Sequence, residues 1–333
     1  MTTGRTRLLP LDAADYRPHP LHSTERTWTE TNCYVDLWVE VLHALGLDPV
    51  AAAAFTLSTD FEGDQWTFFK FPSEDLRALF GIEVNELNVW RPVVDHVLEQ
   101  LELGRLMIMD VDAWFLPDTQ GVSYRMAHTK TALVPNSIDR EHRRLGYFHN
   151  AGYYELEGDD FDGLFRLGAY EDATALPPYA ETVRLDRIRR DLGGQFESVL
   201  ALTQAHLARR PVDDPMARFQ QRMAHDLTWL EGQDTETFHL YAFGTCRQCG
   251  AAAELAASFV DWLAANDPSA GTAGVEDLVM VAESFRTVAT TAKALQFALA
   301  RASRGRKVDL DGLFDGLGLA YGAAMEGLAA RYD

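Results

Sequence analysis

The stretch TETNCYVDLWVEVLHALGLDP, residues 29–49, decides how the first half of the chain is interpreted. From Val35 to Leu45 its apolar residues recur three and four positions apart, which is the spacing of one buried helix face. Gly46 ends that pattern. A helix is therefore predicted from Cys33 onwards, with the cysteine in its first turn.

A thiol in the first turn of a helix lies near the positive end of the helix dipole, which favours the thiolate and predicts a lowered cysteine pKa. Thr31 or Asn32 is the expected N-cap, because either side chain can accept from a free backbone amide of that turn. Cys33 is thus a candidate nucleophile, although an isolated free cysteine is more often buried and inert.

The composition limits the class of protein. The chain has 333 residues and an ordinary globular balance of 47% hydrophobic and 24% charged residues, which predicts two folded domains. With 30 Lys and Arg against 50 Asp and Glu, its net charge of −20 excludes nucleic acid as an expected partner. Three cysteines and the lack of an apolar leader or span predict a cytoplasmic protein without a membrane partner.

Patterning along the chain predicts an α+β domain over residues 1–175 and an all-helical domain over 183–333, joined by a proline-containing linker at 175–186. In the first half, strands are predicted at 65–71, 82–90, 105–118 and 128–135, one or two more at 145–156, and helices at 51–57, 73–81 and 91–104. In the second half, helices are predicted at 187–210, 213–231, 235–266, 275–303 and 308–331.

A nucleophilic cysteine needs a histidine that takes its proton and a third group that orients the imidazole. His128 opens a predicted strand, and the next strand ends with His149 and Asn150. Two adjacent strands joined by a loop would bring Asn150 beside His128. His149 competes with His128 for the role of base, and Asp110 or Asp112 competes with Asn150.

This order of residues is similar to papain-like folds. In more detail, MIMDVDAWFLPDTQGVSYRMAHTKTALV, residues 107–134, resembles a segment of the bacteriocin-processing-peptidase-like and butirosin-biosynthesis acyltransferase families. The matching positions are Asp112, Phe115-Leu116-Pro117, Tyr124 and His128. The resemblance implies a papain-like catalytic domain with Cys33 as nucleophile, His128 as base and Asn150 as orienting group.

The chain also resembles, over nearly its full length, an uncharacterised bacterial family whose genes lie near amino acid:carrier-protein ligases. Three stretches carry that likeness: NCYVDLWVEVLHALGLDP (32–49), DFEGDQWTFFK (60–70) and GYFHNAGYYEL (146–156). Together the resemblances imply transfer of an aminoacyl group from a carrier-protein thioester to an amine acceptor. The enzyme would need no cofactor of its own, because the substrate brings the phosphopantetheine.

The peptidase relatives bind the oxyanion with a glutamine about six residues before the cysteine, where this chain has Thr27. The backbone N–H of Cys33 then needs a second donor, for which Asn32, Thr31 and Gln65 are candidates. Glu62 and Asp64 flank a glycine in an acidic turn and are candidates for binding a substrate ammonium group. More commonly such a turn only faces solvent.

No metal site is predicted. The pair Asp110 and Asp112 has no glycine-rich phosphate loop beside it, and residues 309–316 lack the glycine and glutamate of a calcium loop. Cys246 and Cys249 form a single C-x-x-C within a helical pattern, which cannot supply four zinc ligands. Core packing is the favoured interpretation of that pair, with a redox role as the alternative.

Three function hypotheses follow. The leading one is a cysteine-dependent acyltransferase that acts on an aminoacyl carrier protein and a small amine. The second is a cysteine hydrolase or peptidase, which would use the same residues with water as the acceptor. The third is a non-catalytic adaptor. Because carrier proteins are commonly acidic, the first hypothesis needs a cationic docking patch, for which Arg184–Arg190 is the candidate.

Overall fold

A computed structural model describes residues 4–190 and 195–333. The contacts divide the chain into two compact units. The first holds residues up to 23, 33–47 and 73–190, and the second holds 24–32, 48–72 and 195–333. The predicted catalytic domain 1–175 thus contains two segments that belong to the second unit. The predicted segments at 1–175 and 187–210 include residues 1–3 and 191–194, which lie outside the described residues.

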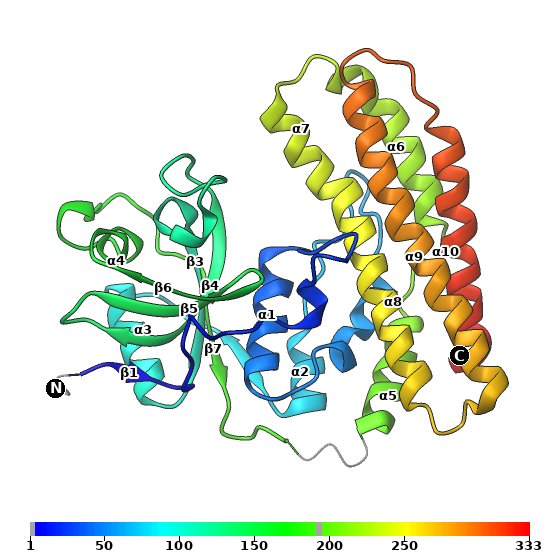
Figure 1. The fold of residues 1–333 in the computed structure, drawn as a ribbon. Helices are drawn as coiled ribbons and strands as arrows, with labels where there is room; N and C mark the ends of the chain where they lie inside the picture. The colour runs from blue at the N-terminus through cyan, green and yellow to red at the C-terminus, as the bar shows by residue number, and fades with distance from the viewer. Residues whose placement is uncertain (1–3, 191–194) are drawn as a thin grey trace. The chain divides into compact units, whose positions relative to one another are not determined.

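The first unit is built on one antiparallel sheet of seven strands in the order β2-β7-β3-β4-β5-β6, with β1 paired to β4 (Figure 1). The strands are β1 (Thr6–Arg7), β2 (Glu83–Glu86), β3 (Leu106–Asp112), β4 (Lys130–Asp139), β5 (Arg144–His149), β6 (Gly152–Glu157) and β7 (Ala180–Arg184). The predicted strands at 82–90, 105–118, 128–135 and 145–156 are confirmed.

Four α-helices accompany this sheet: α1 (Cys33–Ala44), α2 (Ser73–Phe80), α3 (Val93–Glu102) and α4 (Asp159–Leu164). Short 3-10 turns lie at Pro20–His22, Ala113–Phe115, Pro117–Thr119 and Gly168–Tyr170. Helix α1 packs on β4, β5 and β6, and α3 packs on β3 and β4. The predicted helices from Cys33, at 73–81 and at 91–104 are confirmed.

Helix α1 is buried almost all round. Its apolar residues Val35, Leu37, Trp38, Val41 and Leu42 are at most 1% exposed. Such burial fixes the position of its first residue, because a fully enclosed helix cannot slide or rotate without opening cavities. The fold therefore holds Cys33 at one place beside the sheet.

Two predictions for the first 190 residues are wrong. The aromatic run at 65–71 forms only an isolated bridge between Phe61 and Trp66, although Trp66, Phe69 and Phe71 are buried. Conversely, the predicted linker at 175–186 contains β7, which pairs with both β2 and β3. Adjacent prolines precede that strand and mask it, because proline usually marks the end of regular structure.

The second unit is helical, and the predicted helical second half is confirmed for residues 195–333. It contains the 3-10 segment η2 (Val50–Ser58), α5 (Gln195–Leu207), α6 (Pro215–Leu230), α7 (Thr235–Ala242), α8 (Gln248–Asn266), α9 (Gly271–Ala302) and α10 (Asp311–Tyr332). A π-helical turn, Phe243–Arg247, joins α7 to α8, so the predicted helix 235–266 is continuous. Helix α9 packs against α8 and α10, and α10 against α6 (Figure 1).

Across residues 4–190 and 195–333, no helix combines the length and the apolar character that crossing a bilayer requires.

Candidate functional site

Cys33 is the first residue of α1 and is partly exposed. Burial raises the pKa of its thiol, and hydrogen bonding to the Ala132 backbone and the Thr131 side chain opposes that rise. The nearby charge of Asp36 raises the pKa further, whereas Lys130 lowers it. The predicted net lowering by the helix dipole is therefore wrong, because desolvation of a thiolate outweighs it here.

Thr131 connects this thiol to a buried imidazole. Its Oγ1 lies 2.8 Å from Nε2 of His149, and both residues are buried. The register explains the contact: Leu133 of β4 faces His149 of β5, and Thr131 lies two residues before Leu133 on the same face of the sheet. The two strands therefore place the Thr131 hydroxyl between Cys33 and His149.

Asp118 completes the arrangement from the other side of the ring. Its Oδ2 lies 2.6 Å from Nδ1 of His149, and its Oδ1 accepts a hydrogen bond of 2.6 Å from the Tyr147 hydroxyl. The side chains of His149 and Asp118 are only 1% and 5% exposed. The Asp118 carboxylate can accept a proton from Nδ1, and in that tautomer Nε2 accepts from the Thr131 hydroxyl.

We call the set Cys33, Thr131, His149 and Asp118 the thiol relay. The Thr131 hydroxyl contacts both the Cys33 sulfur, whose thiolate it stabilises, and Nε2 of His149. On the far side of the ring, Nδ1–H of His149 can donate to the Asp118 carboxylate. Two of its members, Thr131 and Asp118, were not among the predicted site residues. Thr131 lies within the predicted strand, so the pairing register alone would find it. Asp118 directly follows the Phe115-Leu116-Pro117 motif, but it reaches His149 from a 3-10 turn.

His128 lies just before β4 and outside the thiol relay. Its Nδ1 is 2.6 Å from Oδ2 of Asp112, its ring stacks on Trp114 at 4.5 Å, and its side chain is 70% exposed. Within residues 4–190, no hydrogen bond joins it to Cys33 or to Asn150. The two predicted competitors, His128 and His149, thus each have a carboxylate partner, but only His149 connects to the thiol.

His128 and Asp112 line two adjoining hollows of about 370 Å³ each, over the end of β3. At the edge of one of them, Lys130 pairs with Asp110, with Nζ and Oδ2 3.1 Å apart. Phe115 and Tyr170 add aromatic surface to the other hollow. These hollows offer space for a substrate beside the exposed imidazole.

Asn150 occupies the β5–β6 hairpin turn with φ of 43°, in the left-handed region. Asparagine tolerates that conformation better than most residues, so the turn itself accounts for an asparagine here. Tyr124, which was predicted from the motif, donates its hydroxyl to Asp160 at 2.9 Å. That bond connects the loop before β4 to α4.

The remaining predicted substrate residues belong to the second unit. Asn32 is buried, and its Nδ2 donates to the Phe69 carbonyl at 3.1 Å. Glu62, Asp64 and Gln65 are exposed in the turn closed by the Phe61–Trp66 bridge. There Glu62 accepts the Thr67 hydroxyl at 2.8 Å.

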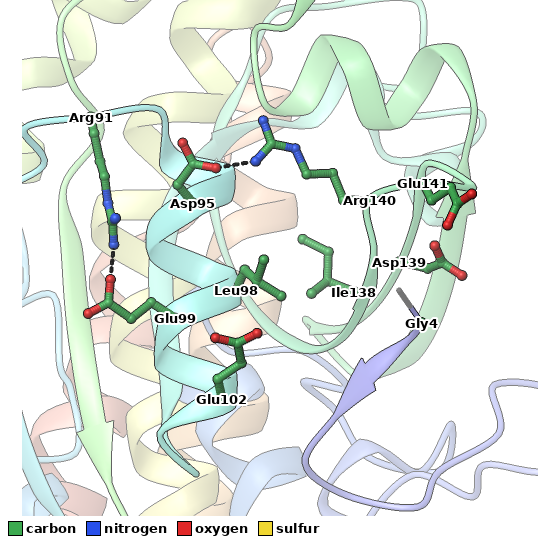
Figure 2. Close-up of a pocket in the computed structure, with 10 residues that line it drawn as sticks. All are labelled: Gly4, Arg91, Asp95, Leu98, Glu99, Glu102, Ile138, Asp139, Arg140 and Glu141. Carbon is green, nitrogen blue, oxygen red and sulfur yellow. Dashed lines mark hydrogen bonds and ion pairs between the residues drawn. The ribbon is translucent and has the colours of Figure 1, made fainter. Parts of the chain in front are cut away.

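A larger hollow, about 570 Å³, lies between α3 and the end of β4 in the first unit (Figure 2). Figure 2 shows that its two arginines are paired within the wall, Arg91 with Glu99 and Arg140 with Asp95. Leu98 and Ile138 form an apolar part of the lining. Among the described residues, no cysteine, serine or histidine lines this hollow.

Among the described residues, no group of three or more His, Cys, Asp and Glu side chains is arranged to hold a metal ion. Cys246 and Cys249 are buried, and burial raises the pKa of Cys246 to about 12. Their predicted place in the core is confirmed.

Comparison with curated proteins gives no match. Two family models do match the chain: the DUF1839 N-terminal domain over residues 17–185, and the DUF1839 C-terminal domain over 194–330. The first of these ranges contains the whole thiol relay, and together they cover nearly all of the sequence. The chain therefore belongs to the DUF1839 family.

Proposed function

We propose that this protein is a cysteine-dependent acyltransferase with a papain-like first unit. The observation that carries the proposal is the thiol relay, in which a partly exposed cysteine at a helix start connects through Thr131 and His149 to Asp118. Nucleophile, imidazole and orienting carboxylate are the parts that covalent acyl transfer requires. Here a hydroxyl stands between the first two.

The raised pKa of Cys33 keeps the thiol protonated at neutral pH, so attack on a carbonyl needs a base. As the sulfur attacks, the thiol proton moves to Oγ1 of Thr131 while the Thr131 hydroxyl proton moves to Nε2 of His149. Asp118 stabilises the imidazolium that forms. The backbone N–H groups of Cys33 and Ala132 lie next to the sulfur and are the candidate donors to the oxyanion.

Collapse of the tetrahedral intermediate breaks the bond from carbon to the leaving sulfur, which receives the proton back from His149 through Thr131. An amine then attacks the acyl-enzyme, the bond from carbon to the Cys33 sulfur breaks, and an amide forms. The proton that the amine loses restores the Cys33 thiol. We propose an aminoacyl group on a carrier-protein phosphopantetheine as donor, on the strength of the resemblances, and a small amine as acceptor.

An acidic carrier protein needs cations on a chain of net charge −20. Within Arg184–Arg190, Arg184 is engaged by Glu83 and Asp186, and Arg187 by Glu83. Arg189 and Arg190 instead bind main-chain carbonyls, of Arg77, Ala78 and Leu45. We propose these two arginines as the centre of the docking patch.

Intact-protein mass spectrometry after mixing the full chain with aminoacylated carrier proteins tests the proposal. We expect an acyl adduct on the wild type, no adduct on Cys33→Ala, and an amide product when amines are added. Release of free amino acid without amide would indicate the hydrolase instead. Absence of any adduct, together with Cys33 resistant to alkylation in the folded protein, would indicate the non-catalytic adaptor.

A further inference from the structure

A buried ionic network lies beside Cys33 in the first unit. His22 is placed between two carboxylates of α1: its Nδ1 bonds Oε1 of Glu40, and its Nε2 lies 3.3 Å from Oδ1 of Asp36. The side chains of His22, Asp36 and Glu40 are 3%, 2% and 0% exposed. A histidine that offers both ring nitrogens to carboxylate oxygens must carry both protons, so His22 is an imidazolium.

Glu40 has further hydrogen-bond partners besides His22. Glu40 also accepts the Tyr16 hydroxyl at 2.6 Å and the His19 backbone N–H at 3.0 Å. Burial alone would lower the pKa of His22, but the hydrogen bonds and charges of Asp36 and Glu40 raise it to about 9. The segment before α1 is thereby fixed to the helix by one cation shared between two anions.

Asp36 follows Cys33 by three residues, so the two side chains lie one helical turn apart on the same face of α1. A carboxylate at that distance opposes ionisation of a thiol, and a cation bound to that carboxylate weakens the opposition. Glu40 lies nearly two turns from Cys33, and its effect on the thiol should be smaller. From β4, the Thr131 hydroxyl reaches the thiol, with His149 and Asp118 behind it. The charge of the neighbouring Lys130 also favours the thiolate.

We infer that His22 is a positioning residue for Cys33: its imidazolium, held between Asp36 and Glu40, screens the carboxylate one turn from the thiol and so sets how readily that thiol ionises. The inference deepens the proposed function, because it assigns a control of reactivity to a residue that touches neither substrate nor sulfur. It also gives a reason for a costly arrangement, since three charged groups are buried together.

The rate of Cys33 alkylation by iodoacetamide, followed by peptide mass spectrometry from pH 6 to 10.5, reports the thiolate fraction in the folded full chain. We expect Asp36→Asn to move the midpoint of that profile down by about 1 pH unit, the shift typical of removing a charge at 4–6 Å. Glu40→Gln should move it down by less. His22→Gln should slow alkylation below about pH 9, where His22 of the wild type is still charged, because Asp36 then lacks that cation.

The direction of the change in the alkylation profile distinguishes loss of electrostatic screening from a general opening of the site. Since burial raises the pKa of the thiol, any variant that merely opens the site moves the midpoint down. A downward shift in His22→Gln, or equal profiles for all variants, would overturn the inference. If circular dichroism shows that His22→Gln does not fold, the sizes of the midpoint shifts in Asp36→Asn and Glu40→Gln decide. A larger shift in Glu40→Gln than in Asp36→Asn would then overturn the inference. His142→Gln, which changes an exposed histidine paired with Asp139, is the control.

The alkylation assay needs no acyl donor, so its outcome is separate from that of the proposed function. Ordered shifts without any acyl adduct would refute acyl transfer and leave the role of His22 in place. An adduct on the wild type with unshifted profiles would support acyl transfer and refute the role of His22.

Discussion

Oγ1 of Thr131 lies 2.8 Å from Nε2 of His149, between that imidazole and the thiol of Cys33. A single hydroxyl therefore separates the candidate nucleophile from its candidate base. In the usual arrangement of a cysteine–histidine pair the two groups touch directly. The extra hydroxyl makes the threonine, rather than either histidine, the most discriminating residue to change.

Thr131→Val keeps the shape of the side chain and removes the hydroxyl. We expect acyl-adduct formation to fall by at least about 10²-fold, the usual contribution of proton transfer by a positioned group. Thr182→Val is the matched control. Thr182 lies on β7 of the same sheet, and its buried hydroxyl donates to the Gln100 side chain at 2.7 Å. Equal rates for the two variants in a single-turnover assay would exclude the relay.

Asp118 has two partners that can be separated by mutation. Asp118→Asn should abolish acyl transfer, since the proton on Nδ1 of His149 is no longer held by a carboxylate. Tyr147→Phe removes only the bond to Oδ1, so transfer should persist while the free energy of unfolding falls by about 1–2 kcal/mol. Urea unfolding and the single-turnover assay measure the two effects. Loss of transfer in Tyr147→Phe would mean that the hydroxyl also orients the relay.

The sequence predicted most elements of the fold because most of them are specified locally. Apolar spacing and a closing glycine are sufficient to define α1, and the long helices of the second half follow in the same way. β7 was missed because a five-residue strand behind two prolines has no local signature, and its existence depends on pairing with β2 and β3. The strand predicted at 65–71 failed for the converse reason, since its aromatic residues are buried without pairing into the sheet.

The site shows the same division. Cys33 and His149 were candidates, His149 as the competitor of His128 for the base, because a cysteine at a helix start and a histidine at a strand end are visible in the sequence. Thr131 was missed because its importance comes from the register of β4 against β5, which a one-residue shift would reverse. Asp118 was missed because it reaches His149 from a 3-10 turn, and the direction of such a turn is not encoded in any periodic pattern.

The buried imidazolium of His22 predicts a loss of stability at alkaline pH. Its pKa rises from about 6.5 in the unfolded chain to about 9 in the fold, so its contribution is complete below pH 6.5 and is lost as pH rises through 9. The shift corresponds to the order of 3 kcal/mol. Urea unfolding of the wild type and of His22→Gln from pH 6 to 10 should give curves that converge with rising pH. Parallel curves would contradict the assignment.

Asp267 predicts the opposite dependence in the helical unit. Burial alone would raise its pKa, but hydrogen bonds from Ser269, Arg331 and Tyr332 lower it to about 2. A lowered pKa stabilises the fold above about pH 4, and that contribution is lost as pH falls to 2. Asp267→Asn should therefore destabilise the protein at pH 7 by about 1–3 kcal/mol and should have little effect at pH 2. Thermal unfolding at both pH values tests this.

Substitutions at Asn150 can distinguish a structural role in the hairpin turn from a catalytic role. If its role is to adopt a φ of 43°, Asn150→Gly should retain the stability and the acyl transfer of the wild type, because glycine adopts that conformation without strain. Asn150→Ala should cost about 1 kcal/mol in the free energy of unfolding, since a Cβ is disfavoured there. Loss of transfer in Asn150→Gly, with unfolding unchanged, would instead show that the carboxamide orients an imidazole. His128→Gln completes the comparison. Loss of acyl transfer in both His128→Gln and Asn150→Gly would indicate His128 as the base, whereas retained transfer in both would leave that role to His149.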